Sequence, residues 1–246
     1  MTRLPDHLSI LERDLRRIFA DRLQSLIAYG LHASVPSDPH QPAHTPHAGA
    51  RTSTLAMIAS LREPDLKVCA EHIRTWHDAG LATPLLLASG EFERSLDAFP
   101  LEFGAIIADY AVVFGPDPFA GLTVEPADLR RACEVQARSH LLHLRQGFVE
   151  TAGNGNALAI LTVRSAAPFA ALVTSVARLQ GLVTHDQAAA GRHAERQLQL
   201  SPGAVTEVVK LAQVADISAA EATRLFSPYL DATERLVQYV DGWGTA

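Results

Sequence analysis

The chain has 246 residues, 48% of them hydrophobic and 20% charged, and its formal net charge is −6 at pH 7. This length suits one large domain or two modest ones, each with a core of its own. The negative charge argues against a nucleic-acid surface, and no apolar run approaches the length needed to cross a bilayer. The N-terminal stretch carries acidic residues within its apolar pattern and does not read as a secretory signal. We therefore expect a cytoplasmic protein with neither a nucleic-acid nor a membrane partner.

The first 120 residues alternate between helical and strand patterns. Residues 7–23 predict an amphipathic helix, and residues 63–80 predict a second helix that begins near Pro64 and ends near Gly80. Strands are expected in the apolar runs 24–30 ("QSLIAYG"), 52–61 ("TSTLAMIASL") and 83–88 ("TPLLLA"), followed by two shorter apolar runs at 99–107 and 110–115. These patterns predict an α+β domain over residues 1–122, with a mixed sheet and flanking helices.

The remaining residues, 123–246, predict an all-α helical bundle. A long helix begins at Pro126 and ends at the "GNGN" turn of residues 153–156. Its apolar stripe has helical spacing and consists of Leu129, Cys133, Ala137, Leu141, Leu144 and Phe148. The apolar region 157–181 predicts a further helix with a kink at Pro168. Its spare apolar face offers a surface for homodimer formation through these C-terminal helices.

Four stretches resemble one known family. They are "FADRLQSLIAYGLHAS" at 19–34, "RSLDAFPLEF" at 94–103, "VVFGPDPFAGL" at 112–122 and "LRRACEVQARSHLLHLRQGF" at 129–148. Together they resemble the nucleotidyltransferase superfamily with the polymerase-β-like fold, in the branch that includes bacterial antibiotic nucleotidyltransferases. The resemblance covers residues 5–150 and implies nucleotide chemistry in a cleft between two domains.

The resemblance also implies a metal site, and the residues for it are missing. In the family, the second strand carries an Asp-x-Asp or Asp-x-Glu pair, whose i and i+2 carboxylates share one face and hold Mg²⁺. Here no Asp or Glu lies between Asp38 and Glu63, and the strand reads Thr-Ser-Thr-Leu-Ala-Met from Thr52 to Met57. We therefore expect no resident metal or cofactor; Mg²⁺ and ATP would be needed only by a working enzyme.

Part of the family's nucleotide-binding pattern is kept in this sequence. The family's first strand leads into Gly-Ser; Gly30 is retained here, but Leu31 stands at the serine position. Gly30, Ser34 and Ser53 are the candidate nucleotide-binding residues. Asp97 and Glu102 fall near the family's third acidic residue and are the residual catalytic candidates. Glu102 is alternatively a structural partner of Arg130 or Arg145.

Three interpretations stay open. The first is a catalytically inactive nucleotidyltransferase-like protein, a pseudoenzyme that acts as a binding or regulatory module. The second is an active Mg²⁺-dependent nucleotidyltransferase that uses Asp38, Asp97 and Glu102. The third is a structural or interaction protein that dimerises through its helical bundle.

The remaining candidates are histidines. His40, His44 and His47 have spacings that suit a metal only on a helix, and the four prolines of the loop at residues 31–51 argue for a solvated loop. His140 and His143 lie three residues apart on the long helix. They are expected to border a helix–helix interface, with a role in acid/base chemistry as the alternative.

Overall fold

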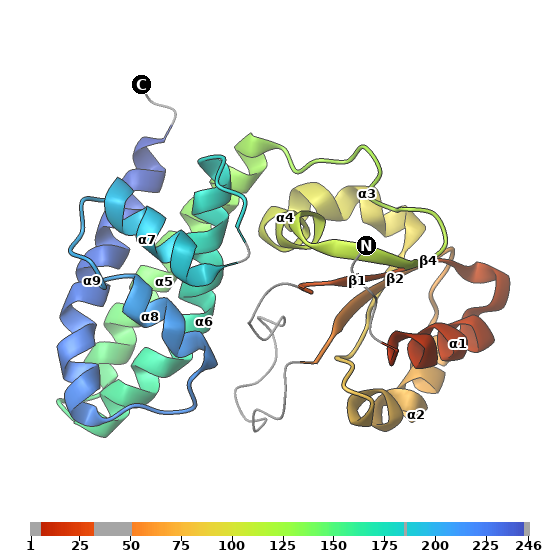
Figure 1. Ribbon diagram of the computed structural model, residues 1–246, viewed down its shortest axis with the longest axis horizontal. Helices are drawn as coiled ribbons and strands as arrows, with labels where there is room; N and C mark the ends of the chain where they lie inside the picture. The colour runs from red at the N-terminus through yellow and green to blue at the C-terminus, as the bar shows by residue number, and fades with distance from the viewer. Residues whose placement is uncertain (1–5, 32–50, 185, 244–246) are drawn as a thin grey trace. The chain divides into compact units, whose positions relative to one another are not determined.

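The computed structural model describes residues 6–31, 51–184 and 186–243, apart from the side chain of Glu93 (Figure 1). These residues form two compact units. The first comprises residues 6–31 and 51–124, and the second comprises residues 125–184 and 186–243. The first unit is α+β and the second is all-α, which confirms the predicted fold class.

The first unit is built on a mixed four-stranded sheet. Its strands are β1 (Leu23–Tyr29), β2 (Ser53–Ile58), β3 (Leu85–Ala88) and β4 (Tyr110–Phe114). They lie in the order β3-β2-β1-β4; β2 and β3 are parallel, and the other two pairs are antiparallel. Its helices are α1 (Leu8–Phe19), the short 3₁₀ helix η1 (Ala20–Arg22), α2 (Glu63–Asp78), α3 (Ser89–Ala98) and α4 (Pro100–Ala108).

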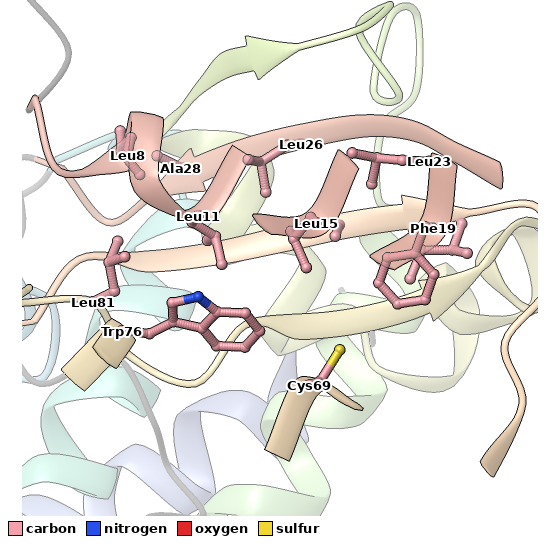
Figure 2. Packing of buried hydrophobic residues seen from close by; sticks show 12 residues of the cluster. Leu8, Leu11, Leu15, Phe19, Leu23, Leu26, Ala28, Cys69, Trp76 and Leu81 are labelled. Atoms are coloured by element: carbon pink, nitrogen blue, oxygen red, sulfur yellow. The ribbon is translucent and has the colours of Figure 1, made fainter. Parts of the chain in front are cut away.

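Helices α1 and α2 cover one face of this sheet (Figure 2). Leu11 and Leu15 of α1 recur at helical spacing and pack with Trp76 of α2 over the side chains of Leu26 and Ala28. All five are buried. The face that the sequence pattern predicted to be apolar in the first helix is therefore the face that packs on the sheet.

The opposite face of the sheet packs against a second apolar cluster. Leu55 and Met57 of β2 lie there with Phe92 of α3, Phe103 of α4 and Phe119 of the following loop. Helices α3 and α4 occupy much of the stretch 94–107, where the sequence analysis assigned no helix. Pro100 begins α4 at its first helical position, which separates two short helices that residue spacing alone does not resolve.

The second unit is a helical bundle. Its helices are α5 (Pro126–Glu150), α6 (Gly155–Leu179), α7 (Gln187–Gln197), α8 (Thr206–Lys210), η2 (Leu211–Gln213) and α9 (Ala219–Gly242). Helices α5, α6 and α9 pack on one another around Phe169 and Tyr229, which are fully buried. Helix α6 continues through Pro168.

Two details of the bundle correct the sequence analysis. In the stripe of α5, the buried position expected for Leu141 is taken by His140. Phe148, expected in the same stripe, is 46% exposed and stacks on Phe226. In addition, α6 is long and apolar enough to span a membrane, contrary to the expectation for any run in this chain. Its buried side chains, including Phe169 and Val173, lie in the bundle, as is typical of the core helix of a globular domain.

Candidate functional site

The candidate nucleotide-binding residues Gly30 and Ser53 meet at one end of the sheet. Ser53 pairs with Tyr29, the residue directly before Gly30. Gly30 has a positive φ of 65° and donates its N–H to the carbonyl oxygen of Asp109 at 2.9 Å. Glycine adopts this left-handed conformation without the steric cost that a Cβ brings. Antiparallel pairing of β1 with β2 thus brings together two residues that lie more than 20 positions apart.

Three polar side chains form a row across this end of the sheet. Tyr29 of β1 pairs with Ser53 of β2 on one side and with Tyr110 of β4 on the other. Directly paired residues point to the same face of a sheet, and both tyrosines pack against the cluster of Leu55 and Phe119. The row therefore faces α3 and α4.

The sequence analysis missed Tyr110 and the residue that fixes it, Asp117. The Tyr110 hydroxyl donates to Asp117 Oδ2 at 2.9 Å, and Asp117 Oδ1 accepts the backbone N–H of Phe119 at 2.9 Å. Burial raises the pKa of Tyr110, and the hydrogen bond to Asp117 raises it further. This tyrosine therefore remains a protonated hydrogen-bond donor. An aromatic residue is common at the start of a strand, so no sequence pattern distinguishes Tyr110 as a site residue.

Strand β2 is buried along its whole length and offers no anionic ligand. Its burial extends over both faces: Leu55 and Met57 lie in the cluster of α3 and α4, whereas Ala56 and Ile58 face α1 and α2. The Oγ1 atom of Thr54 is buried without a hydrogen-bond partner in the described structure. One neutral hydroxyl does not replace two carboxylates as a ligand set for Mg²⁺.

The two acidic candidates lie on different helices. Asp97 is exposed in the last turn of α3, and Glu102 is partly buried in the first turn of α4. Within residues 6–31, 51–184 and 186–243, no three His, Cys, Asp or Glu side chains are grouped so that they could hold a metal ion. The donor set of this part of the chain therefore does not fit the family's metal.

Other expected residues lie elsewhere or outside the described residues. Ser34, Asp38 and the loop histidines His40, His44 and His47 fall outside them. Arg130 and Arg145, suggested as partners of Glu102, form ion pairs within the bundle. Arg130 lies 3.5 Å from Glu134, and Arg145 lies 2.7 Å from Glu234. Pairing of Glu102 with either arginine stays a prediction.

No protein-family model matches the sequence, and no curated protein sequence matches it either. The fold does match a solved structure, that of the spectinomycin adenyltransferase AAD(9) from Enterococcus faecialis with ATP and spectinomycin. The match has a TM-score of 0.56 and 10% sequence identity, and it covers 94% of this chain and 98% of the other. Similarity at this identity establishes the fold and leaves the activity open. The chain thus has a nucleotidyltransferase-like fold, the fold of an antibiotic nucleotidyltransferase, over nearly its whole length.

Proposed function

We propose that this protein is a catalytically inactive member of the nucleotidyltransferase-like fold that acts as a binding or regulatory module. One observation supports the proposal above others: β2, the strand where a nucleotidyltransferase needs its metal-binding carboxylates, is buried along its whole length and carries only neutral side chains. Leu55 is 0% exposed and Met57 is 5% exposed. Neither side chain can coordinate a cation.

The physical consequence concerns the charge of a nucleotide triphosphate. A bound Mg²⁺ neutralises the phosphate oxygens and stabilises the charge that develops during nucleotidyl transfer. An ionised carboxylate in the apolar surroundings of Leu55 would also carry a large desolvation cost without a partner. The packing around β2 therefore opposes a metal site that would form by a small rearrangement of this strand. It favours nucleotide binding without catalytic turnover.

A module of this kind retains parts of the surface that a nucleotide could use. The left-handed turn at Gly30 and the half-buried side chains of Tyr29 and Tyr110 provide backbone, hydroxyl and aromatic groups at one end of the sheet, next to the buried Ser53. Bases stack on aromatic rings without any need for metal. Since the structurally similar adenyltransferase was solved with ATP, ATP is the first ligand to test.

The test is isothermal titration of the purified protein with ATP, with and without Mg²⁺. We expect any affinity for ATP to be independent of Mg²⁺ and unchanged in Asp97→Asn and Glu102→Gln. The matched control is Asp78→Asn, which removes an exposed carboxylate at the end of α2. Mg²⁺-dependent binding that is lost in Asp97→Asn or Glu102→Gln but kept in the control would overturn the proposal. It would instead favour the active enzyme that uses Asp38, Asp97 and Glu102.

A second readout follows catalysis directly. The protein is incubated with ATP, Mg²⁺ and spectinomycin, the compound present in the structure of the similar adenyltransferase, and released pyrophosphate is measured. We expect no release above that of a protein-free blank. Release that depends on both protein and spectinomycin would contradict catalytic inactivity, whatever the titration shows.

A further inference from the structure

The helical bundle contains a groove between two of its helices. It lies between α5, over residues 136–151, and α6, over residues 157–168, and its volume is about 490 Å³. That volume falls within the range of small-molecule sites. All of the residues that line it belong to the second unit, so its shape is set by the packing of these two helices.

The middle of the groove is apolar. Leu144 is buried at its base, and Gly147 faces Leu161, where a Cβ on the glycine would lie 2.6 Å from Leu161 Cδ1. Ile160 lines the same space and remains 55% exposed. Exposed apolar surface in a concavity favours a ligand with an apolar body, because binding removes that surface from water.

One end of the groove carries a buried histidine whose hydrogen-bonding capacity is only half used. His140 is 7% exposed, its Nε2 atom lies 2.6 Å from the Tyr229 hydroxyl, and its ring stacks on Phe169 with centroids 5.4 Å apart. Burial, with a smaller contribution from His143, lowers the pKa of His140 to about 4, so the ring is neutral at pH 7. A neutral imidazole has two hydrogen-bonding nitrogens. Nδ1 has no hydrogen-bond partner among the described residues.

A cation also lines the groove. Arg164 lines the groove, is exposed, and forms no ion pair with any residue of the described ranges. Pro168, one turn later, has no N–H, so the Arg164 carbonyl also lacks its usual helical donor. Ser139, whose hydroxyl lies 3.3 Å from His143 Nδ1, adds a further polar group. The groove therefore combines one fixed positive charge with neutral hydrogen-bonding groups.

The other end of the groove carries the opposite charge. Glu150 lies three residues beyond Gly147 on α5, and Arg164 lies three residues beyond Leu161 on α6. The two helices are joined by a short turn and run antiparallel, so the charges are separated by about 9 Å along the helix axes at a rise of 1.5 Å per residue. A ligand with one anionic group suits the Arg164 end, whereas a second anionic group near Glu150 would be repelled.

We propose that the α5–α6 groove binds a small monocarboxylate with an apolar body. Its carboxylate pairs with the Arg164 guanidinium, and its apolar body lies over Leu144 and Leu161, while His140 and Ser139 supply neutral polar groups to the same groove. A guanidinium presents parallel N–H donors that match a carboxylate. The proposal is independent of nucleotide binding, because every residue it uses lies in α5 or α6 of the second unit.

The test uses 2-naphthoate as the probe and the uncharged 2-naphthalenemethanol as its isostere, both titrated into the full-length protein. We expect 2-naphthoate to bind at millimolar concentration or tighter, and to bind more tightly than the alcohol. Arg164→Gln should weaken 2-naphthoate binding about tenfold, the loss typical of one charged hydrogen bond, and leave the alcohol unaffected. Because Arg164 is exposed, this variant should fold normally.

The matched control is Arg17→Gln, which removes an exposed helical arginine from the first unit and should change neither affinity. Three outcomes would overturn the proposal. They are no binding of 2-naphthoate to the wild-type protein, equal affinity for the alcohol, and equal losses in the Arg164 and Arg17 variants.

Discussion

At the scale of single residues, the buried carboxylate of Asp14 illustrates how this fold satisfies its polar groups. Asp14 lies in α1 and is 3% exposed. Its Oδ2 atom accepts the indole N–H of Trp76 at 3.1 Å, and its Oδ1 atom lies 3.2 Å from Arg13 Nη2. Trp76 itself is 1% exposed and packs with α1 over the sheet. The hydrogen bond thus joins α1 and α2 within the cluster of Figure 2.

Asp14→Ala should cost more when the indole N–H of Trp76 is present than when that donor has already been removed. Asp14→Ala leaves the buried indole N–H without an acceptor, so we expect the free energy of unfolding to fall by about 2 kcal/mol. In the background of Trp76→Phe, which has no N–H, the same Asp14→Ala change should cost at least about 1 kcal/mol less. Urea unfolding of the four proteins, followed by circular dichroism, measures the difference. Equal costs in the two backgrounds would show that the indole bond does not stabilise the first unit.

At the scale of secondary-structure elements, the end of β4 is fixed by a glycine that touches β1. Gly115 has a φ of 78°, and a Cβ there would overlap the carbonyl oxygen of Gln24 and lie 3.0 Å from its carbonyl carbon. Gly121 has nearly the same φ, 75°, but a Cβ there would meet no atom within 4 Å. Comparing the two glycines therefore distinguishes the cost of a positive φ alone from the added cost of a steric clash with β1.

Gly115→Ala should therefore destabilise the protein much more than Gly121→Ala. Both changes carry the cost of a left-handed alanine, about 1 kcal/mol, and Gly115→Ala adds a clash with backbone that cannot move without disturbing β1. We expect a total loss of about 3 kcal/mol for Gly115→Ala. Thermal unfolding of both variants is the measurement. Similar losses would mean that β4 shifts away from β1 at little cost.

The sequence predicted the elements that have a strong periodic signal. The helix that contains Leu8 and Leu15 and the three strand runs up to Ala88 are present in the structure. The helix buries one face, β1 and β2 are largely buried, and the apolar residues of β3 are half-buried. Helices α3 and α4 were not predicted, since a short helix has few turns in which to show a period. On α5, His140 took the place expected for Leu141 because a stripe spaced by three or four residues admits either neighbour.

The candidate site was less predictable than the fold. The resemblance to the family makes Gly30 and Ser53 nucleotide-binding candidates together, and the antiparallel pairing of β1 with β2 that joins them came from the structure. Tyr110 joins them through a strand more than 50 residues further along the chain, and no local pattern specifies such a partner. The groove beside His140 depends on how two helices pack. The sequence analysis placed this histidine at a helix–helix border but could not show the space beside it.

At the scale of the whole molecule, the structure shows where the apolar side chains of α6 lie. The sequence suggested that region 157–181 offers a spare apolar face for a dimer, but most of the large apolar side chains of α6 lie in the bundle, with Ile160 an exposed exception. Homodimer formation through the C-terminal helices stays a prediction. The fold match extends over 94% of the chain, well beyond the residues 5–150 in which the sequence resembles the family. The similarity of fold thus extends over more of the chain than the similarity of sequence does.

Two units with separate cores should also respond separately to acid, and Glu195 provides the means to test this. Glu195 is 6% exposed, and its Oε1 atom accepts backbone N–H groups of Gly203, Val205 and Thr206 at 3.1, 3.0 and 2.7 Å. Burial raises the pKa of Glu195, but these hydrogen bonds outweigh it and hold the pKa below the ordinary value of 4.5. The resulting stabilisation is complete above pH 4.5 and is lost as the pH falls through the lowered pKa.

Glu195→Gln should therefore remove part of the acid sensitivity of the second unit alone. The chain has two tryptophans, Trp76 in the first unit and Trp243 at the end of α9 in the second. Urea unfolding between pH 5 and pH 3, followed by tryptophan fluorescence with and without Trp243→Phe, separates the two signals. We expect Glu195→Gln to flatten the pH dependence of the transition reported by Trp243 and to leave that of Trp76 unchanged. An equal change at both tryptophans would mean that the two units unfold as one cooperative body, because a local hydrogen-bond network in the bundle can alter the first unit only through such coupling.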